Sequence, residues 1–76
     1  MTLERTEKPI RVGARVRRWD GVLGTVGMNT QGKSAYEAGE HFVIEWDDGE
    51  AAFSGTLAEF EHEGIQRTGR VAAWAR

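Results

Sequence analysis

The fold of this chain is decided by residues 41–53, HFVIEWDDGEAAF, an apolar run that turns and then comes back. Phe42, Ile44 and Trp46 recur at the two-residue period of a β-strand, with Val43 and Glu45 between them. An Asp-Gly pair between two such runs is the strongest short-range signal for a hairpin. The stretch therefore predicts a central β-hairpin that turns at its Asp-Gly pair.

The chain has 76 residues, no cysteine and a formal net charge of -2. This length predicts a single small domain, because so short a chain buries only about 60% of its unfolded surface. Without cysteine there is no disulfide, thiolate zinc site or cysteine nucleophile, which fits a reducing cytoplasm. No apolar run approaches the roughly 20 residues that cross a bilayer, and the first residues lack a signal-peptide core. We therefore expect a cytoplasmic protein that does not associate with membranes.

Charge is segregated along the chain. Residues 1–18 hold six basic side chains against two carboxylates, whereas residues 37–64 hold nine carboxylates and no lysine or arginine. One interpretation is that the basic and acidic strands pair across a sheet. The other is a bipolar surface that docks a charged partner or a second copy of the chain.

The residues before the hairpin predict two strands. Residues 1–10, with the only proline at Pro9, predict a flexible N-terminal arm. The first strand alternates Val12, Ala14 and Val16 on one face with Arg15, Arg17 and Trp19 on the other. A tight turn at Asp20-Gly21 then leads into a second strand over residues 22–28. Within that strand Gly24 and Gly27 predict corners of a small barrel.

The remaining segments predict one long loop, one helical turn and a closing strand. Residues 29–40 are polar and form the loop, in which Tyr36 either packs on the barrel or contacts a ligand. Leu57 and Phe60 have the spacing of one helical or 3₁₀ turn, capped by Thr56 and Glu59. A last strand over residues 64–68 closes the sheet with Ile65 inward. The tail, residues 69–76, frays, forms a helical turn or lays Trp74 over the barrel mouth.

This order of elements resembles the SH3-like barrel of Tudor and KOW-type modules, across residues 11–68. The resemblance implies an all-β fold, a small five-stranded SH3-like barrel with one 3₁₀ turn before the last strand. A narrower resemblance rests on GARV at residues 13–16, GTV at 24–26, FVIEWDDGE at 42–50 and FSG at 53–55. These motifs resemble a family of very short bacterial proteins, frequent in actinobacteria and classed as a domain of unknown function. The leading aromatic is phenylalanine here, the family's usual proline-rich loop is absent, and the family brings no activity to inherit.

A second resemblance is to the type II dihydrofolate reductases, short SH3-like barrels whose first strand also reads Gly-x-Arg-Val-Arg. Their pore needs a Val-Gln-Ile-Tyr run after the hairpin glycine, and here residues 50–54 read EAAFS. The glutamine and tyrosine that would bind pteridine and nicotinamide are absent. Reductase activity is therefore a remote alternative.

Tudor-like barrels bind methylated ammonium groups in a cage of aromatic rings completed by an acidic residue. The candidate rings and carboxylates here are Trp19, Tyr36, Trp46, Phe53, Asp47, Asp48 and Glu50. The competing interpretation is that Trp46 shares a strand face with core residues and is itself core.

A basic and aromatic set predicts nucleic-acid binding as an alternative, because bases stack on indoles while arginines meet phosphates. Its members are Arg11, Arg15, Arg17, Arg18 and Trp19. The acidic hairpin argues against this alternative, since its carboxylates repel a phosphate backbone unless they face away.

Metal and catalytic sites are not indicated. His41 and His62 lack the spacing of a recognisable metal site, and Ser34 and Ser54 have no base positioned by the sequence. We expect no cofactor and a non-enzymatic module that binds a protein or peptide through residues 29–40, Trp19 and the hairpin tip. Homo-oligomers are a third hypothesis, because free sheet edges invite strand pairing.

Overall fold

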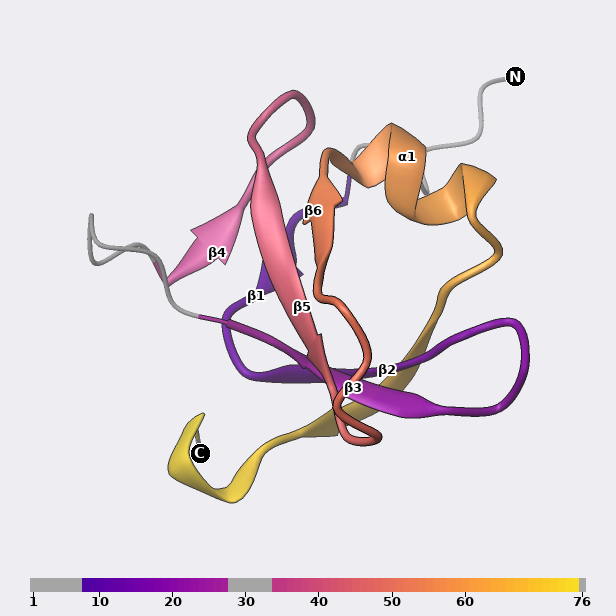
Figure 1. Ribbon diagram of the computed structural model, residues 1–76. Coiled ribbons are helices and arrows are strands. Elements are labelled where there is room, and N and C mark those ends of the chain that lie inside the picture. Colours follow the sequence, from indigo (N-terminus) through magenta and orange to yellow (C-terminus); the bar gives the residue numbers. More distant parts are fainter. Residues whose placement is uncertain (1–7, 28–33, 76) are drawn as a thin grey trace.

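The computed structural model describes residues 8–27 and 34–75, which form short strands, one helix and one 3₁₀ turn (Figure 1). The strands are β1 (Ile10–Arg11), β2 (Ala14–Arg17), β3 (Leu23–Val26), β4 (Ala35–Tyr36), β5 (Phe42–Trp46), β6 (Phe53–Gly55) and β7 (Gln66–Val71). Helix α1 spans Leu57–His62 and the 3₁₀ turn η2 spans Ala73–Ala75. The predicted all-β character is confirmed, with one short helix added.

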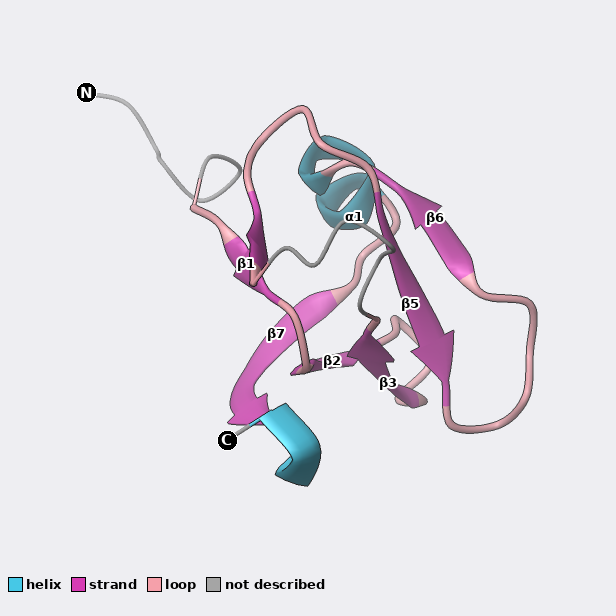
Figure 2. Cartoon of the chain, turned by 90° about the vertical axis from the view of Figure 1, so that its left-hand side faces the viewer, coloured by secondary structure: helices cyan, strands magenta, loops and turns pink. Residues whose placement is uncertain are grey.

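The strands of the described residues form two antiparallel sheets. The larger has five strands in the order β6-β5-β3-β2-β7, and the smaller pairs β1 with β4. The larger sheet ends at β6 and β7, with α1 between them in the chain (Figure 2). The prediction of five strands omits the short pair β1 and β4, because residue 10 was expected in the arm and residues 29–40 in a loop.

Strands β5 and β6 are neighbours in the larger sheet and pair in antiparallel fashion. β5 pairs with β6 with Phe42 opposite Gly55 and Ile44 opposite Phe53. Pairing stops short of the tip, so residues 47–52 form a loop longer than a two-residue turn. Gly49 adopts φ 81° in this loop, a left-handed conformation that glycine takes without steric cost.

The core follows the alternation seen in the sequence. Phe42, Ile44 and Trp46 are buried, whereas Val43 between them is 40% exposed. Phe42 lies at the centre of an aromatic group, with ring centroids 5.5 Å from Tyr36, 5.9 Å from Phe53 and 6.0 Å from Phe60. The other buried apolar residues are Ile10, Val12, Val16, Val26, Leu57 and Ile65.

The element before the last strand is an α-helix and not the predicted 3₁₀ turn. The Phe60 N–H donates to the Thr56 carbonyl at 2.9 Å, the four-residue spacing of an α-helix. The predicted capping is present, since the Thr56 N–H donates to Glu59 Oε1 at 2.9 Å. Leu57 and Phe60 are both buried, as their spacing predicted. The 3₁₀ turn η2 instead follows β7.

Strand residues extend beyond the predicted range 11–68 at both ends. Ile10 was assigned to the arm but is 1% exposed and pairs with Tyr36 in the smaller sheet. Val71 was assigned to the tail but pairs with Ala14 at the end of β7. A register shift in β7, where Gly69 has φ 83°, lets the strand continue past the predicted end. Residues 1–7 of the predicted arm lie outside the described residues.

Candidate functional site

The basic strand β2 and the acidic β5–β6 loop are joined by an ion pair. Arg15 extends from the solvent face of β2, opposite Thr25 of β3. Its Nη1 donates to Thr25 Oγ1 at 2.6 Å and to Asp47 Oδ1 at 3.2 Å, while Nη2 donates to Asp47 Oδ2 at 2.7 Å. Such a bidentate geometry fixes both side chains, because two parallel hydrogen bonds define the orientation of the guanidinium.

Arg18 makes a second link to the same loop. Its Nε and Nη2 donate to the two carboxylate oxygens of Asp20, each at 2.8 Å. Nη2 also donates to Asp48 Oδ2 at 3.1 Å, and the guanidinium carbon lies 5.1 Å from the centroid of the Trp46 ring. The arginine therefore bridges the β2–β3 turn, the acidic loop and the aromatic core.

These ion pairs set the acidity of their carboxylates. The hydrogen bond from Arg18 lowers the pKa of Asp20 to about 2, because it stabilises the charged carboxylate. The hydrogen bond from Arg15 likewise lowers the pKa of Asp47 and is matched by a raised pKa of Arg15. Both pairs are therefore fully ionised at neutral pH.

A shallow pocket opens beside Arg18, with a volume of about 180 Å³. Its apolar walls come from Trp19, Trp46, Phe53 and Ile65, and Glu63 and Arg18 supply its charges. Trp19 lies in the β2–β3 turn and is 74% exposed, the highest value among the large apolar residues described. We call this site the Trp19 pocket, lined by Arg18, Trp19, Trp46, Ala51, Phe53, Glu63 and Ile65.

The four rings of the predicted cage do not come together. Trp19, Trp46 and Phe53 share the Trp19 pocket, but Tyr36 is 1% exposed in the core and its hydroxyl donates to the Gly27 carbonyl at 3.2 Å. The position over Trp46 is taken by the chain's own Arg18. The structure thus corrects the predicted ligand contact at Tyr36, which is a core residue.

The other predicted contact residues lie at the surface. Asp47, Asp48 and Glu50 are exposed on the β5–β6 loop. Glu50 donates its backbone N–H to Asp48 Oδ1 at 3.0 Å, which shapes the loop tip. Of the predicted loop at residues 29–40, positions 29–33 lie outside the described residues, and residues 35 and 36 form β4.

The five residues predicted to bind nucleic acid in the alternative function are not equally free to contact a ligand. Arg15 and Arg18 are engaged by carboxylates, and Arg11 Nη2 donates to the Ala75 carbonyl at 2.7 Å. Arg17 is exposed, and no ion pair joins it to another of the residues that the structure describes. Arg15 and Arg18 thus pair with carboxylates of the β5–β6 loop, so opposite charges meet for these two basic residues, through a loop and not across strands.

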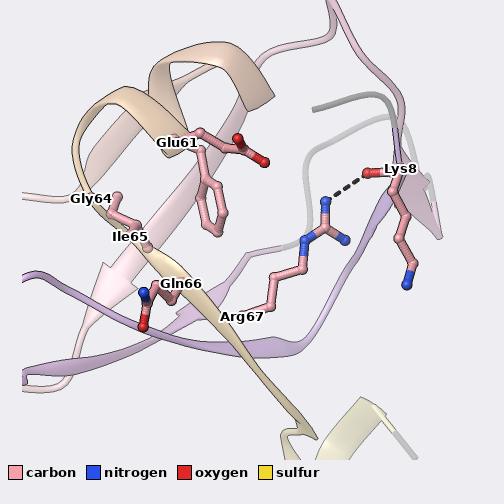
Figure 3. A pocket seen from close by; sticks show the side chains of 7 residues that line it. Lys8, Glu61, Gly64, Ile65, Gln66 and Arg67 are labelled. Atoms are coloured by element: carbon pink, nitrogen blue, oxygen red, sulfur yellow. Dashed lines mark hydrogen bonds between the residues drawn. The ribbon is translucent and has the colours of Figure 1, made fainter. Parts of the chain in front are cut away.

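A larger pocket, of about 430 Å³, lies between α1, β7 and the segment at Lys8 (Figure 3). Arg67 reaches across it, donating from Nη1 to the Pro9 carbonyl at 2.8 Å and from Nη2 to the Lys8 carbonyl at 2.6 Å. Burial lowers the pKa of Arg67, and the nearby Glu61 carboxylate opposes that shift. Because both terminal nitrogens of Arg67 bind backbone, this side chain ties the Lys8 segment to β7.

Sequence reasoning did not identify Glu63 as a pocket residue or Arg67 as a tether. Arg67 stands two residues after the buried Ile65, so the strand period places it on the inner face. A guanidinium on the inner face of a strand needs hydrogen-bond acceptors. This requirement was the feature of the sequence that could have indicated a tethering role for Arg67. Glu63 carries no comparable signal, because its place depends on how the helix meets Trp19.

Comparison of the chain with known protein families, with curated proteins and with solved structures found no match. Across the described residues, no group of three or more histidine or acidic side chains is placed to hold a metal ion. In the same part of the chain, no helix is long and apolar enough to span a membrane.

Proposed function

We propose that this chain is a small, non-enzymatic SH3-like barrel that serves as a protein or peptide interaction module, with the Trp19 pocket as its contact site. The order of the strands in the five-stranded sheet and the short helix before the last strand support assignment to that barrel class. So does the resemblance to short bacterial proteins with a Trp-Asp-Asp-Gly hairpin.

The observation that carries the proposal is the exposure of Trp19, which lines a pocket together with Trp46 and Phe53. An exposed tryptophan offers a large apolar area at low entropic cost, and tryptophan is enriched at the energetic centres of protein interfaces. The pocket volume of about 180 Å³ is below the range of about 300–1,000 Å³ typical of small-molecule sites. Its size suits a single side chain of a protein partner.

Charge supports a particular kind of partner. Glu63 lines the pocket, and Asp20 and Asp48 flank it through their contacts with Arg18. The pocket and its rim thus hold three carboxylates and one guanidinium, and two of the carboxylates bond to that guanidinium. A partner segment that presents positive charge beside an apolar side chain complements this surface.

The test is affinity capture from a bacterial lysate with the immobilised chain, followed by binding isotherms with each purified captured protein. We expect Trp19→Ala to weaken binding about ten-fold or more, the cost of losing an interface hot spot. Val43→Ala is the matched control, because Val43 is an exposed apolar residue outside the pocket. Equal binding by Trp19→Ala and the unchanged chain would contradict the proposal.

Nucleic-acid association is the alternative, and the exposure of both Arg17 and Trp19 is the observation in its favour. Against it stand the carboxylates that already pair with Arg15 and Arg18. Nuclease treatment of the lysate separates the two functions, since only nucleic-acid-mediated capture is then lost. A labelled single strand that shifts at low salt, and fails to shift with Arg15→Glu and Arg17→Glu, would favour the alternative.

A further inference from the structure

Two exposed tryptophans lie at opposite ends of β2. Trp19 follows the end of the strand, in the β2–β3 turn, and is 74% exposed. Trp74 is 59% exposed in η2, which packs beside Gly13 at the start of the strand. Figure 1 shows this separation, with the C-terminal turn at the lower left and the β2–β3 turn at the right. The β2–β3 turn that carries Trp19 and the C-terminal turn that carries Trp74 therefore lie at different ends of β2.

The surroundings of Trp74 are basic. Arg11 is exposed and donates to the Ala75 carbonyl, and Arg70 is exposed near the end of β7. Within residues 8–27 and 34–75, no carboxylate forms an ion pair with either arginine. We call this region the Trp74 corner, made of Arg11, Gly13, Arg70, Trp74 and Ala75. It combines positive charge with an exposed apolar ring, the features that complement the Trp19 pocket.

We infer that the Trp74 corner of one copy docks on the Trp19 pocket of a second copy, in a head-to-tail contact. This inference rests on the proposed function and names the partner. One chain cannot make the contact with itself, because its two surfaces lie at opposite ends of β2. The indole of Trp74 packs against Trp19, and Arg11 and Arg70 face Glu63 and the carboxylates around Arg18.

A contact between two different surfaces leaves one of each free in every dimer. Head-to-tail association therefore builds rings or open chains and does not stop at a symmetric pair. The charges involved are exposed, so added salt screens their attraction. Self-association is thus expected to grow with protein concentration and to weaken at high salt.

Sedimentation velocity from micromolar to millimolar protein, at low and high salt, tests the inference. We expect the unchanged chain to form a concentration-dependent series of species, and Trp19→Ala and Trp74→Ala each to remain monomeric. Mixed in equal amounts, the two variants should form dimers and nothing larger, because each retains one intact surface. Val43→Ala should behave as the unchanged chain. Circular dichroism and thermal unfolding establish that each variant is folded.

Arg70→Glu provides a second variant that leaves both tryptophans in place, and we expect it to raise the apparent Kd about ten-fold at low salt. The inference is wrong if the unchanged chain stays monomeric at every concentration, if Trp19→Ala associates as well as the unchanged chain, or if the mixed variants stay monomeric. A monomeric chain whose captured partners still require Trp19 refutes self-docking and leaves the proposed function intact. If the chain stays monomeric and its captured partners do not require Trp19, both the self-docking inference and the proposed function are wrong.

Discussion

The Arg18 guanidinium lies 5.1 Å from the centroid of the Trp46 ring and is held there by Asp20 and Asp48. The arginine therefore covers an indole that is otherwise part of the core, and it forms one wall of the Trp19 pocket. Two different loops supply the carboxylates that orient it. The pocket thus depends on a contact between the β2–β3 turn and the β5–β6 loop.

Removing Arg18 should uncover Trp46. In a chain that carries Trp19→Phe and Trp74→Phe, Trp46 is the only tryptophan left. We expect Arg18→Ala in this background to shift Trp46 emission to longer wavelength and to increase its quenching by acrylamide. Arg17→Ala is the control, because Arg17 is exposed and does not contact the ring. An unchanged spectrum in the Arg18 variant would show that the guanidinium does not shield Trp46.

Gly24 of β3 is a position where no side chain fits. A Cβ built there would lie 2.5 Å from Trp46 Cε3 and 2.9 Å from Ile44 Cγ2. We expect Gly24→Ala to lower the free energy of unfolding by about 1–3 kcal/mol through overpacking, measured by urea denaturation. Among the described residues other than its chain neighbours, the atom nearest to a Cβ built at Gly27 is the Val43 carbonyl oxygen, at 3.7 Å. Gly27→Ala should therefore have a much smaller effect, and equal losses at both positions would contradict this account.

Phe42 anchors the aromatic part of the core, and its neighbour Val43 faces solvent. We expect Phe42→Ala to lower the free energy of unfolding by about 3–5 kcal/mol, because it removes a ring that packs against three others. Val43→Ala, at a side chain that is 40% exposed, should change it by no more than about 0.5 kcal/mol. Thermal unfolding of the two variants measures both expected changes in stability. Similar losses of unfolding free energy in the two variants would contradict the assignment of Phe42 to the buried face of β5 and of Val43 to the exposed face.

Acid should weaken the ion pairs that Arg18 forms with Asp20 and Arg15 forms with Asp47. The pKa of Asp20 is about 2 in the folded chain against an ordinary 3.8, so the unfolded chain binds more protons between those values. The stability contributed by the Arg18–Asp20 pair is therefore present above about pH 4 and is lost as pH falls through about 2. The lowered pKa of Asp47 acts in the same direction.

The double variant Asp20→Asn, Asp47→Asn isolates this contribution. We expect its unfolding temperature to be below that of the unchanged chain at pH 7, and the difference to shrink as pH is lowered from 4 towards 2. Glu45→Gln, an exposed change on the same sheet face, is the control. A difference that stays constant over this pH range would mean that neither pair is linked to folding.

Local patterns in the sequence were enough for several elements. The alternation of Phe42, Ile44 and Trp46 placed β5 and its buried face, and the Asp20-Gly21 pair placed the β2–β3 turn, where Gly21 has φ 93°. The spacing of Leu57 and Phe60 placed a helical element with both side chains in the core. Each of these depends on residues within a few positions of one another, and short-range periodicity records such relationships directly.

Local patterns were misleading where pairing partners are distant. Tyr36 stands in a polar, glycine-containing stretch and was a candidate contact residue, yet its strand pairs with Ile10 and the ring is buried. The last strand was predicted to end at Thr68, but pairing with β2 extends it to Val71. In both cases a neighbouring strand supplies hydrogen bonds that local composition does not encode.

The sequence by itself determined β5 and its buried face, the turn at Asp20-Gly21 and a capped helical element with Leu57 and Phe60 inward, because these follow from the order of neighbouring residues. It also determined that basic and acidic residues occupy separate segments. Only the tertiary structure decided which of them meet. Arg15 and Asp47 are 32 residues apart, and Arg18 and Asp48 are 30 apart, so their contacts follow from the register of β2, β3 and β5.

The same register brings Trp19 beside Trp46, Phe53 and Glu63, and so creates a pocket from four segments that are separate in the chain.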